Sequence, residues 1–362
     1  MKNNKQNQQN ATVNNIYVPQ LLKCFSQFDK QDLGLEAKTG FNVFDAEDRN
    51  LYGGIHEGLY ILGAVSSLGK TSFCLQLADQ ISEHEQDVLF FSLEQSPYEL
   101  LSKSISRHTY LIAKEQKKED YKQLAKETAQ ILNKHRYNFY APEEKHIISM
   151  AIKNYSTQAK HLYILPGQYQ GKQLTVTDIS NIVKEHISKT NNIPIVFIDY
   201  LQLLAMSNPT FRGTDKQAID LVTTSLKGIS REFKTAVIAI SSFNRESYNA
   251  PITLASFKES GAIEYSADLL LGLEYGEING PGMEHKKLET DKDYRTRITA
   301  LKESNIQKKA NKTPVTILLK CLKNRNGNTF SCNFNFLHAY NYFEEIKNDD
   351  DHFLFPVYPN SF

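Results

Sequence analysis

The stretch from Leu59 to Leu77, LYILGAVSSLGKTSFCLQL, decides the fold that this sequence predicts. An apolar run with strand character, Leu59 to Gly63, is followed by a short polar loop and then by a helical pattern with Phe73, Leu77 and Ile81 on one face. A phosphate-binding loop needs this order, because backbone N–H groups of the loop and the helix N-terminus together hold the phosphates of a nucleotide. The alternative is a glycine-containing turn that happens to precede a helix, and the strand–loop–helix context disfavours it.

Two side chains of the loop have predicted roles toward a bound nucleotide. Lys70 would reach the β- and γ-phosphates, and the hydroxyl of Thr71 would bind Mg²⁺. The consensus loop opens with glycine, and this sequence has alanine there. We therefore expect ATP and Mg²⁺ as cofactors, and we expect the nucleotide contacts to come from Ala64, Ser66, Ser67, Leu68, Gly69, Lys70, Thr71 and Ser72.

Composition limits the kind of protein. The chain has 362 residues, of which 40% are hydrophobic, enough for a large α/β domain with its own core. Because 42 basic residues face 41 acidic ones, net charge does not predict nucleic-acid binding, which would depend on local patches. The four cysteines form no CxxC pair, and no stretch has the length of a transmembrane helix or the character of a signal peptide. We expect a soluble, cytoplasmic protein with no membrane association.

Carboxylates follow two further apolar strands. Val88 to Leu93 is followed by Glu94, and Ile195 to Ile198 is followed by Asp199. In open parallel sheets the ligand lies at the carboxyl ends of the strands, so both carboxylates would face the phosphate loop. Asp199 would hold Mg²⁺, and Glu94 would polarise a water for attack on the γ-phosphate. Spacing alone leaves open a second role for Glu94, as a helix cap.

The rest of the chain alternates between strand and helix patterns, which predicts a doubly wound, mostly parallel α/β sheet with a C-terminal β-hairpin edge. We expect residues 107–165 to be helical with a solvated, charged face, and residues 276–312 to be a mobile insertion. The expected organisation is a disordered polar segment (1–15), an N-terminal arm (16–45), an ATPase domain (46–346) and a tail (347–362). A helix from Ile16 to Gln31 in the arm would pack either on its own domain or on a neighbouring subunit.

Several motifs, in order from about Thr39 to Phe343, together resemble a known family. They are Ala64–Thr71, Phe91–Glu94, Ile198–Leu204, Ser241–Arg245, Glu259–Gly261 and Lys323–Gly327. This set resembles the C-terminal motor domain of the DnaB-type replicative helicases, a hexameric branch of the RecA-like ATPases. In that family alanine also opens the phosphate loop.

The resemblance implies roles for individual residues. Glu94 would be the catalytic base, and Lys323 and Arg325 would reach the γ-phosphate held by the adjacent subunit of a homo-hexameric ring. The alternative for Lys323 and Arg325 is a surface hairpin with solvated cations. Two loops would grip single-stranded DNA, and the candidate cations in them are Arg212, Lys216, Arg245 and Lys258. Polar loops of this kind are otherwise simply solvated.

Three features depart from the family pattern. Ser242 replaces a glutamine that senses the γ-phosphate, too few residues precede the core for the helical collar, and the 276–312 insertion is longer than expected. The leading hypothesis is an ATP-dependent hexameric helicase or translocase on single-stranded DNA, acting in replication of a phage or mobile element, with a separate primase or loader. The alternative is a nucleotide-switched assembly protein that binds DNA or a partner without unwinding. A third, weaker hypothesis is a regulatory ATPase of the circadian or recombination-mediator kind.

Overall fold

The computed structural model describes residues 35–48, 50–116, 121–169, 171–207, 211–244, 250–257, 261–279 and 289–347. The predicted polar segment 1–15, the predicted helix Ile16–Gln31 and the tail from residue 348 lie outside the described residues. In the described residues no helix is both long and apolar enough to cross a membrane.

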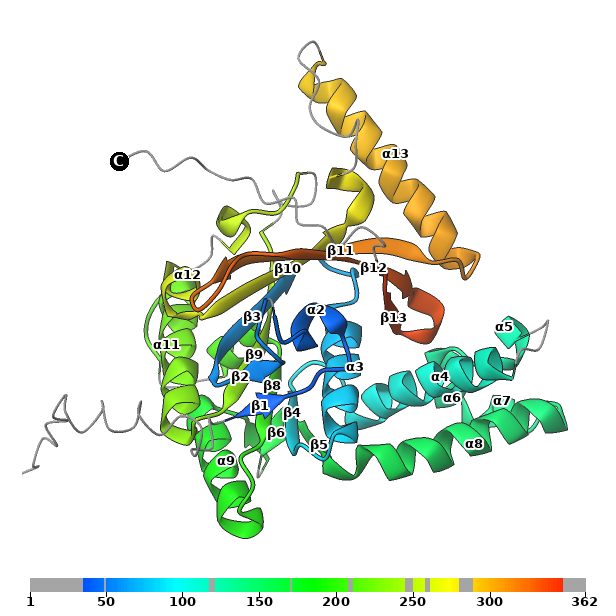
Figure 1. Cartoon of the computed structure of the whole chain (residues 1–362), viewed down its shortest axis with the longest axis horizontal. Helices are drawn as coiled ribbons and strands as arrows, with labels where there is room; N and C mark the ends of the chain where they lie inside the picture. Colours follow the sequence, from blue (N-terminus) through cyan, green and yellow to red (C-terminus); the bar gives the residue numbers. More distant parts are fainter. Residues whose placement is uncertain are drawn as a thin grey trace, which may run out of the picture. The chain divides into compact units, whose positions relative to one another are not determined.

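A nine-stranded sheet runs through the described structure in the order β13-β12-β11-β10-β3-β9-β8-β4-β5 (Figure 1). Neighbouring strands from β10 to β5 pair in parallel, so their carboxyl ends meet at one edge of the sheet. These strands are β10 (Leu269–Tyr275), β3 (Gly58–Ala64), β9 (Ala236–Ser242), β8 (Ile195–Asp199), β4 (Val88–Ser92) and β5 (Leu162–Pro166). The predicted doubly wound, mostly parallel sheet is confirmed.

Both faces of the parallel strands are covered, because their side chains alternate between two apolar clusters. Along β3, Tyr60 and Leu62 pack into the cluster that contains α3 (Lys70–Glu83), while Leu59 and Ile61 pack into the opposite one. The opposite cluster includes residues of α9 (Val176–Thr190) and α11 (Asp215–Phe233). Figure 1 shows α3 on one side of the sheet and α9 and α11 on the other.

Antiparallel strands extend the sheet beyond β10. The predicted hairpin is formed by β11 (Val315–Asn324) and β12 (Ser331–Leu337), which pair with each other, while β11 also pairs with β10. A further strand, β13 (Tyr342–Glu345), pairs with β12 and was not predicted. The chain turns into β13 through Asn341 at φ 52°, a left-handed conformation that asparagine tolerates better than most residues.

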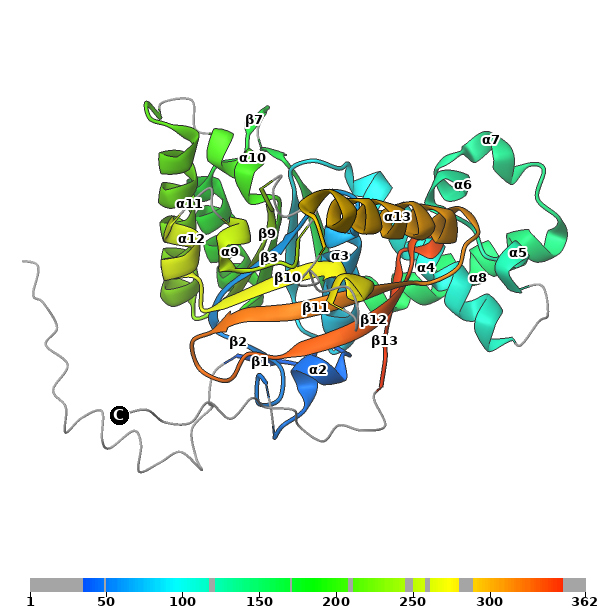
Figure 2. The ribbon, with the colours of Figure 1, turned by 90° about the horizontal axis from the view of Figure 1, so that it is seen from above.

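The prediction that residues 107–165 are helical throughout was wrong at its end, because β5 is a strand that pairs with β4 at the edge of the sheet. As the last strand of the sheet, β5 has a neighbouring strand on one side only, so its sequence lacks the fully buried apolar run of the central strands. The preceding helices are α4 (Pro97–Glu115), α5 (Tyr121–Leu124), α6 (Thr128–Leu132), α7 (Lys134–Tyr137) and α8 (Pro142–Gln158). They lie together to one side of the sheet in both views (Figures 1 and 2).

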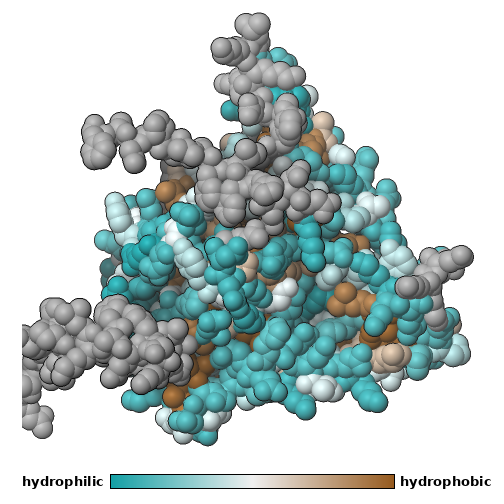
Figure 3. Space-filling view, viewed as in Figure 1, coloured by the Kyte–Doolittle hydropathy of each residue, from teal (hydrophilic) through white to brown (hydrophobic). Residues whose placement is uncertain are grey.

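The prediction of a mobile insertion over residues 276–312 was also wrong for its second half. Residues Asp291–Ala310 form the 20-residue helix α13, which begins at Thr290, whose side chain accepts a hydrogen bond from the backbone of Asp293. Leucine, lysine, glutamate, glutamine and alanine dominate its second half, and these residues favour helix without any apolar periodicity. Figure 1 shows α13 projecting away from the sheet, with its C-terminal end near the start of β11, and Figure 3 shows a predominantly hydrophilic surface on the visible face.

The remaining short elements join these parts. They are β1 (Glu36–Ala37), α2 (Asn42–Asp45), β2 (Ile55–His56), η1 (Ala159–His161), β6 (Gln168–Tyr169), β7 (Lys172–Gln173), α10 (Leu201–Met206), η3 (Leu254–Phe257), α12 (Gly261–Ser266), η4 (Gly276–Asn279) and η5 (His338–Tyr340).

A buried ion pair fastens α3 to α4. Asp79 and Arg107 have side-chain exposures of 4% and 3%, and their charged groups are in direct contact. Asp79 also accepts hydrogen bonds from Ser104 Oγ at 2.7 Å and from the hydroxyl of Tyr155 on α8 at 2.9 Å. This carboxylate therefore joins three helices at one point.

Removing the cation of this pair should destabilise the fold strongly. Arg107→Ala leaves the Asp79 carboxylate buried without its counter-charge, and we expect the free energy of unfolding in urea to fall by about 3–5 kcal/mol. Lys189→Ala is the matched control, because Lys189 pairs with Glu185 on the surface, at side-chain exposures of 71% and 55%, and its loss should matter little. Equal effects of the two substitutions would contradict the role given to the buried pair.

Candidate nucleotide-binding site

The predicted phosphate loop joins the carboxyl end of β3 to the N-terminus of α3. Two of its residues have a left-handed backbone, Ser67 at φ 65° and Gly69 at φ 93°. A Cβ atom on Gly69 would lie 2.7 Å from the ring of Phe336, so both the backbone angle and the space require glycine there. Because Gly69 is the N-cap of α3, the first N–H groups of the helix point toward the loop and can bind an anion.

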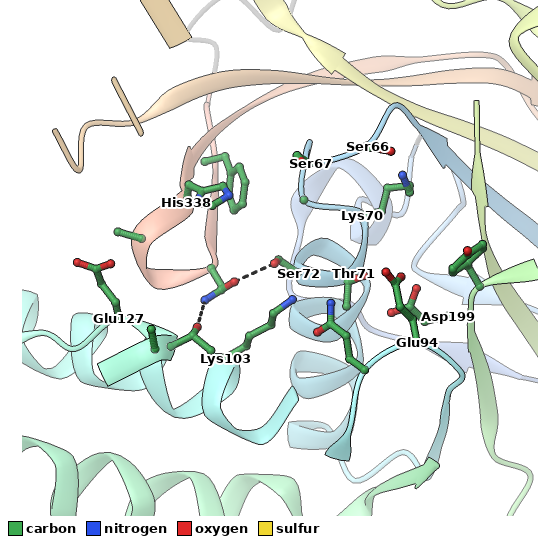
Figure 4. Close-up of a pocket in the computed structure, with 18 of the residues that line it drawn as sticks. Ser66, Ser67, Lys70, Thr71, Ser72, Glu94, Lys103, Glu127, Asp199 and His338 are labelled. Atoms are coloured by element: carbon green, nitrogen blue, oxygen red, sulfur yellow. Dashed lines mark hydrogen bonds between the residues drawn. The ribbon is translucent and has the colours of Figure 1, made fainter. Parts of the chain in front are cut away.

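Most of the predicted loop residues line one pocket with a cavity volume of about 540 Å³ (Figure 4). Ser66, Ser67, Gly69, Lys70, Thr71 and Ser72 belong to its wall. Ala64 and Leu68, also predicted as contacts, do not line it, because their side chains are buried in the core at 0% and 2% exposure.

Lys70 lies across the loop. Its Nζ donates hydrogen bonds to the carbonyl oxygens of Ala64, at 3.0 Å, and Val65, at 3.2 Å. A phosphate in the pocket would offer this ammonium group a charged acceptor in place of these two neutral carbonyls.

Asp199 ends β8, which runs parallel between β4 and β9, and its side chain faces the pocket. Burial raises the pKa of this carboxyl to about 6; a hydrogen bond from Thr71 opposes the shift, and the negative charge of Glu94 adds to it. Its Oδ2 atom is buried and has no hydrogen-bond partner in the described structure. A buried carboxylate oxygen in this state needs a cation or a donor.

The oxygen atoms of Thr71 and Asp199 fit a hard divalent cation such as Mg²⁺. The described residues contain no group of three or more His, Cys, Asp or Glu side chains that could hold a metal ion. This sparse donor set suits Mg²⁺, which takes one or two protein oxygens and completes its octahedron with water and substrate phosphates.

Glu94 lies in the turn after β4, beside Asp199 (Figure 4). The backbone N–H of Leu93 donates to the carbonyl of Asp199 at 2.8 Å, which fixes this turn against the end of β8. The N-cap of α4 is Ser96, which forms a capping box with Glu99. The alternative role of Glu94 as a helix cap is therefore wrong, and its exposed carboxylate is left facing the pocket.

Sequence reasoning missed Lys103, which projects from α4 into the same end of the pocket (Figure 4). Burial lowers the pKa of its ammonium, although the negative charges of Asp199 and Glu94 oppose that shift. In the sequence, Lys103 looks like any other lysine on a charged helix. Only its place, about two turns into the helix that follows β4, could have indicated that its side chain reaches the pocket.

The other end of the pocket was also missed. It is lined by Glu127, Thr128 and Ala129 of the α6 region and by Phe336, His338, Ala339 and Asn341 of the β12–β13 connection. Burial lowers the pKa of His338, and the nearby cations Lys309 and Lys103 lower it further, so this imidazole is neutral at pH 7. Asn341 joins the two walls: it accepts from Ser72 Oγ at 2.9 Å and donates to Thr128 Oγ1 at 2.8 Å.

The C-terminal end of α13 contacts the rim of the pocket. Lys309 Nζ donates to the carbonyl oxygen of Ser67 at 3.1 Å, and burial lowers the pKa of this lysine. Just beyond the helix, Lys312 pairs with Glu127 at 2.7 Å. The insertion expected to be mobile is therefore attached to both walls of the pocket.

Lys323 and Arg325 lie away from the pocket of their own chain. The backbone N–H of Arg325 donates to Asp268 O, and that of Asp268 donates to Leu59 O, both at 2.8 Å, which places the hairpin turn at the amino end of β3. The six residue steps from Gly58 to Ala64 span about 20 Å at 3.3 Å per residue, and they separate this end of β3 from the phosphate loop. The Arg325 guanidinium contacts Asp268 Oδ1 at 3.1 Å, and Lys323 donates to the carbonyl of Ala267 at 2.8 Å.

The structure places two of the predicted DNA-contacting cations. Arg212 is exposed in the loop before α11, and Lys216 is exposed on the first turn of α11. Neither lines the nucleotide pocket. Arg245 and Lys258 lie outside the described residues, as do Glu259 and Ser260 of the quoted motifs.

The fold and the site together define a P-loop α/β protein of the RecA-like kind. The family model for the DnaB-like helicase C terminal domain matches residues 36–345. The chain therefore belongs to the DnaB-like helicase C-terminal domain family, and the resemblance drawn from the motifs is confirmed.

Relatives and solved structures agree with this family. The chain is 32% identical over 222 residues to a probable replicative DNA helicase of Trieres chinensis, covering 59% of this chain and 42% of that protein. It is 29% identical over 220 residues to the replicative DNA helicase DnaB of Mycoplasma genitalium, covering 59% and 41%. The chain thus matches less than half the length of each.

Two solved structures share the fold at 21% identity. The ATPase domain of G40P has a TM-score of 0.66, covering 91% of this chain and 98% of that one. A DnaB-like replicative helicase, studied with its interactions with primase, has a TM-score of 0.65, covering 92% and 67%.

The contact between α13 and the phosphate loop has a measurable consequence. Lys309→Ala removes the donor that holds Ser67 in its left-handed conformation, and we expect the affinity for a fluorescent ADP analogue to fall by about tenfold in equilibrium titration. Lys308→Ala is the matched control, because Lys308 is on the same turn but pairs with Glu277 at 2.9 Å. If both variants bind like the wild type, α13 does not position the loop.

Proposed function

We propose that this chain is the motor domain of an ATP-hydrolysing, ring-forming, DnaB-like helicase or translocase that acts on single-stranded DNA in replication. The observation that carries the proposal is the convergence of Lys70, Thr71, Glu94 and Asp199 on one pocket in a domain of this family. Origin in a phage or mobile element, a hexameric ring, and a separate primase or loader are finer parts of the same proposal.

ATP fits this pocket in one direction. The triphosphate lies against the N-terminus of α3. There the ammonium of Lys70 gives up its hydrogen bonds to the loop carbonyls and binds the β- and γ-phosphates instead. The base and ribose then extend toward the opposite end, between Glu127 and His338 (Figure 4). The neutral His338 suits an uncharged base better than a phosphate.

Thr71 and Asp199 hold Mg²⁺ in this arrangement. The cation, when bound, neutralises charge that develops on the β- and γ-phosphate oxygens. The orphaned Oδ2 of Asp199 and the Thr71 hydroxyl are the protein atoms that support this assignment.

Glu94 accepts a proton from the attacking water. Its carboxylate is exposed to the pocket, and its turn is held by the end of β8, so the base has a fixed position relative to the metal ligands. Lys103 faces the same region and adds positive charge where the γ-phosphate lies.

Lys323 and Arg325 complete the site from a neighbouring subunit. Their distance from the pocket of their own chain along β3 leaves them available at an interface, and Arg325 keeps 41% of its side chain exposed. A cation supplied in trans stabilises the charge of the transition state and couples hydrolysis to assembly. Single-stranded DNA would be held by the loops that carry Arg212, Lys216, Arg245 and Lys258.

The alternative is a nucleotide-switched assembly protein that does not unwind DNA. Ser242 favours it, because this side chain at the end of β9 lines the pocket and is shorter than the glutamine of the family. A forked duplex with a single-stranded 5′ or 3′ tail separates the two functions. A motor displaces the labelled strand in the presence of ATP, whereas a switch leaves it paired even when DNA alters its ATPase rate.

Glu94→Gln should separate binding from turnover. The amide keeps the shape of the side chain but cannot take the proton of water, so we expect ATP turnover to fall by about 100-fold or more with unchanged nucleotide affinity. Glu115→Gln, at the far end of α4, is the control for loss of one negative charge. Full turnover in Glu94→Gln would remove Glu94 from the proposed mechanism.

Subunit mixing tests the shared site. Arg325→Ala and Glu94→Gln should each be inactive as single variants, for different reasons. Co-expressed, they should regain turnover, because some interfaces then combine an intact Glu94 in one subunit with an intact Arg325 in the next. Normal ATP turnover by Arg325→Ala would rule out that Arg325 acts in the site of a neighbouring subunit. So would a co-expressed mixture whose turnover is as low as that of either single variant.

A further inference from the structure

The turn that carries Glu94 also presents Gln95 to the nucleotide pocket. Three contacts fix this turn: Ser92 Oγ donates to the carbonyl of Gln95 at 2.6 Å, Leu93 is tied to Asp199, and Ser96 begins α4 with a capping box. The side chains of Glu94 and Gln95 therefore start from a rigid backbone next to the predicted position of the γ-phosphate. Rigid support of this kind is what a residue needs to orient a reacting molecule.

The amide of Gln95 has an unsatisfied acceptor. Its Oε1 is buried, and no donor of the described structure reaches it. A buried acceptor left unpaired loses the hydrogen bond that it would make with water, which is unfavourable. Of the two amide side chains that line the pocket, Asn341 is already bonded to Ser72 and Thr128, whereas the Oε1 of Gln95 has no partner in the described structure.

Among the described residues, the β9 side of the pocket does not supply an equivalent amide. Ser242 lines the pocket from the end of β9, and its backbone N–H lies 3.4 Å from Oε1 of Gln202. Gln202 is itself buried and donates to Ser241 Oγ at 3.1 Å. A water next to the γ-phosphate would therefore find its amide partner on the Glu94 side.

We propose that Gln95 orients the attacking water, as a partner of Glu94, in the ATP hydrolysis described under the proposed function, on which this inference rests. The water oxygen forms a bond to the γ-phosphorus as the bond from that phosphorus to the β,γ-bridging oxygen breaks, and the bonding pair leaves with ADP. One water proton passes to the Glu94 carboxylate. The other hydrogen stays on the oxygen, is held by Gln95 Oε1, and leaves in the inorganic phosphate.

The test compares two glutamines that each have a buried Oε1 without a hydrogen-bond partner, one in the pocket and one outside it. Gln95→Ala should lower kcat for ATP by about tenfold or more, with KM, fluorescent ADP affinity and melting temperature unchanged. Gln158→Ala is the matched control, because Gln158 on α8 also has a buried, unpartnered Oε1 but does not line the pocket, and its kcat should stay at the wild-type value.

A second variant makes the result specific for an amide in the pocket. Adding Ser242→Gln to Gln95→Ala should restore much of the lost kcat, because the new side chain extends into the same pocket from β9. Unchanged kcat in Gln95→Ala, or a loss explained by weaker nucleotide binding or a lower melting temperature, would overturn this inference alone. A wild-type protein that binds nucleotide but never hydrolyses it would overturn the proposed function as well.

Discussion

Parallel pairing of the central strands is the constraint on which the site depends. Ala64 is level with Ser242 across β3 and β9, and Ser92 is level with Asp199 across β4 and β8. This register brings the predicted phosphate loop, the Asp199 carboxylate and the Glu94 turn to one edge of the sheet, although they lie far apart in sequence. A shift of one residue in any of these pairs would turn the terminal side chain to the other face.

The elements that could be predicted from sequence are those with an unambiguous local pattern. Central strands such as β3 and β8 are continuous apolar runs, because they are buried on both faces, and the loop before α3 has its own motif. The edge strand β5 has one partner strand and a half-exposed sequence, and α13 has charged residues without periodicity, so both were misjudged. Neither pattern distinguishes a packed element from a solvated one.

The residues of the candidate site likewise fall into those that the sequence predicts and those that it does not. Glu94 and Asp199 could be predicted because they end strands of the sheet, where position follows from topology. Lys103, His338 and Asn341 could not, because each reaches the pocket only through the packing of α4 and of the β12–β13 connection against α3. Tertiary contacts of this kind leave no mark on local sequence.

The proposed function is tested most directly by ATP hydrolysis of the wild type with and without single-stranded DNA, with the mass measured by light scattering in the same buffer. We predict DNA-stimulated turnover by a particle of about six times the 41.4 kDa chain. A monomer whose hydrolysis ignores DNA would contradict it.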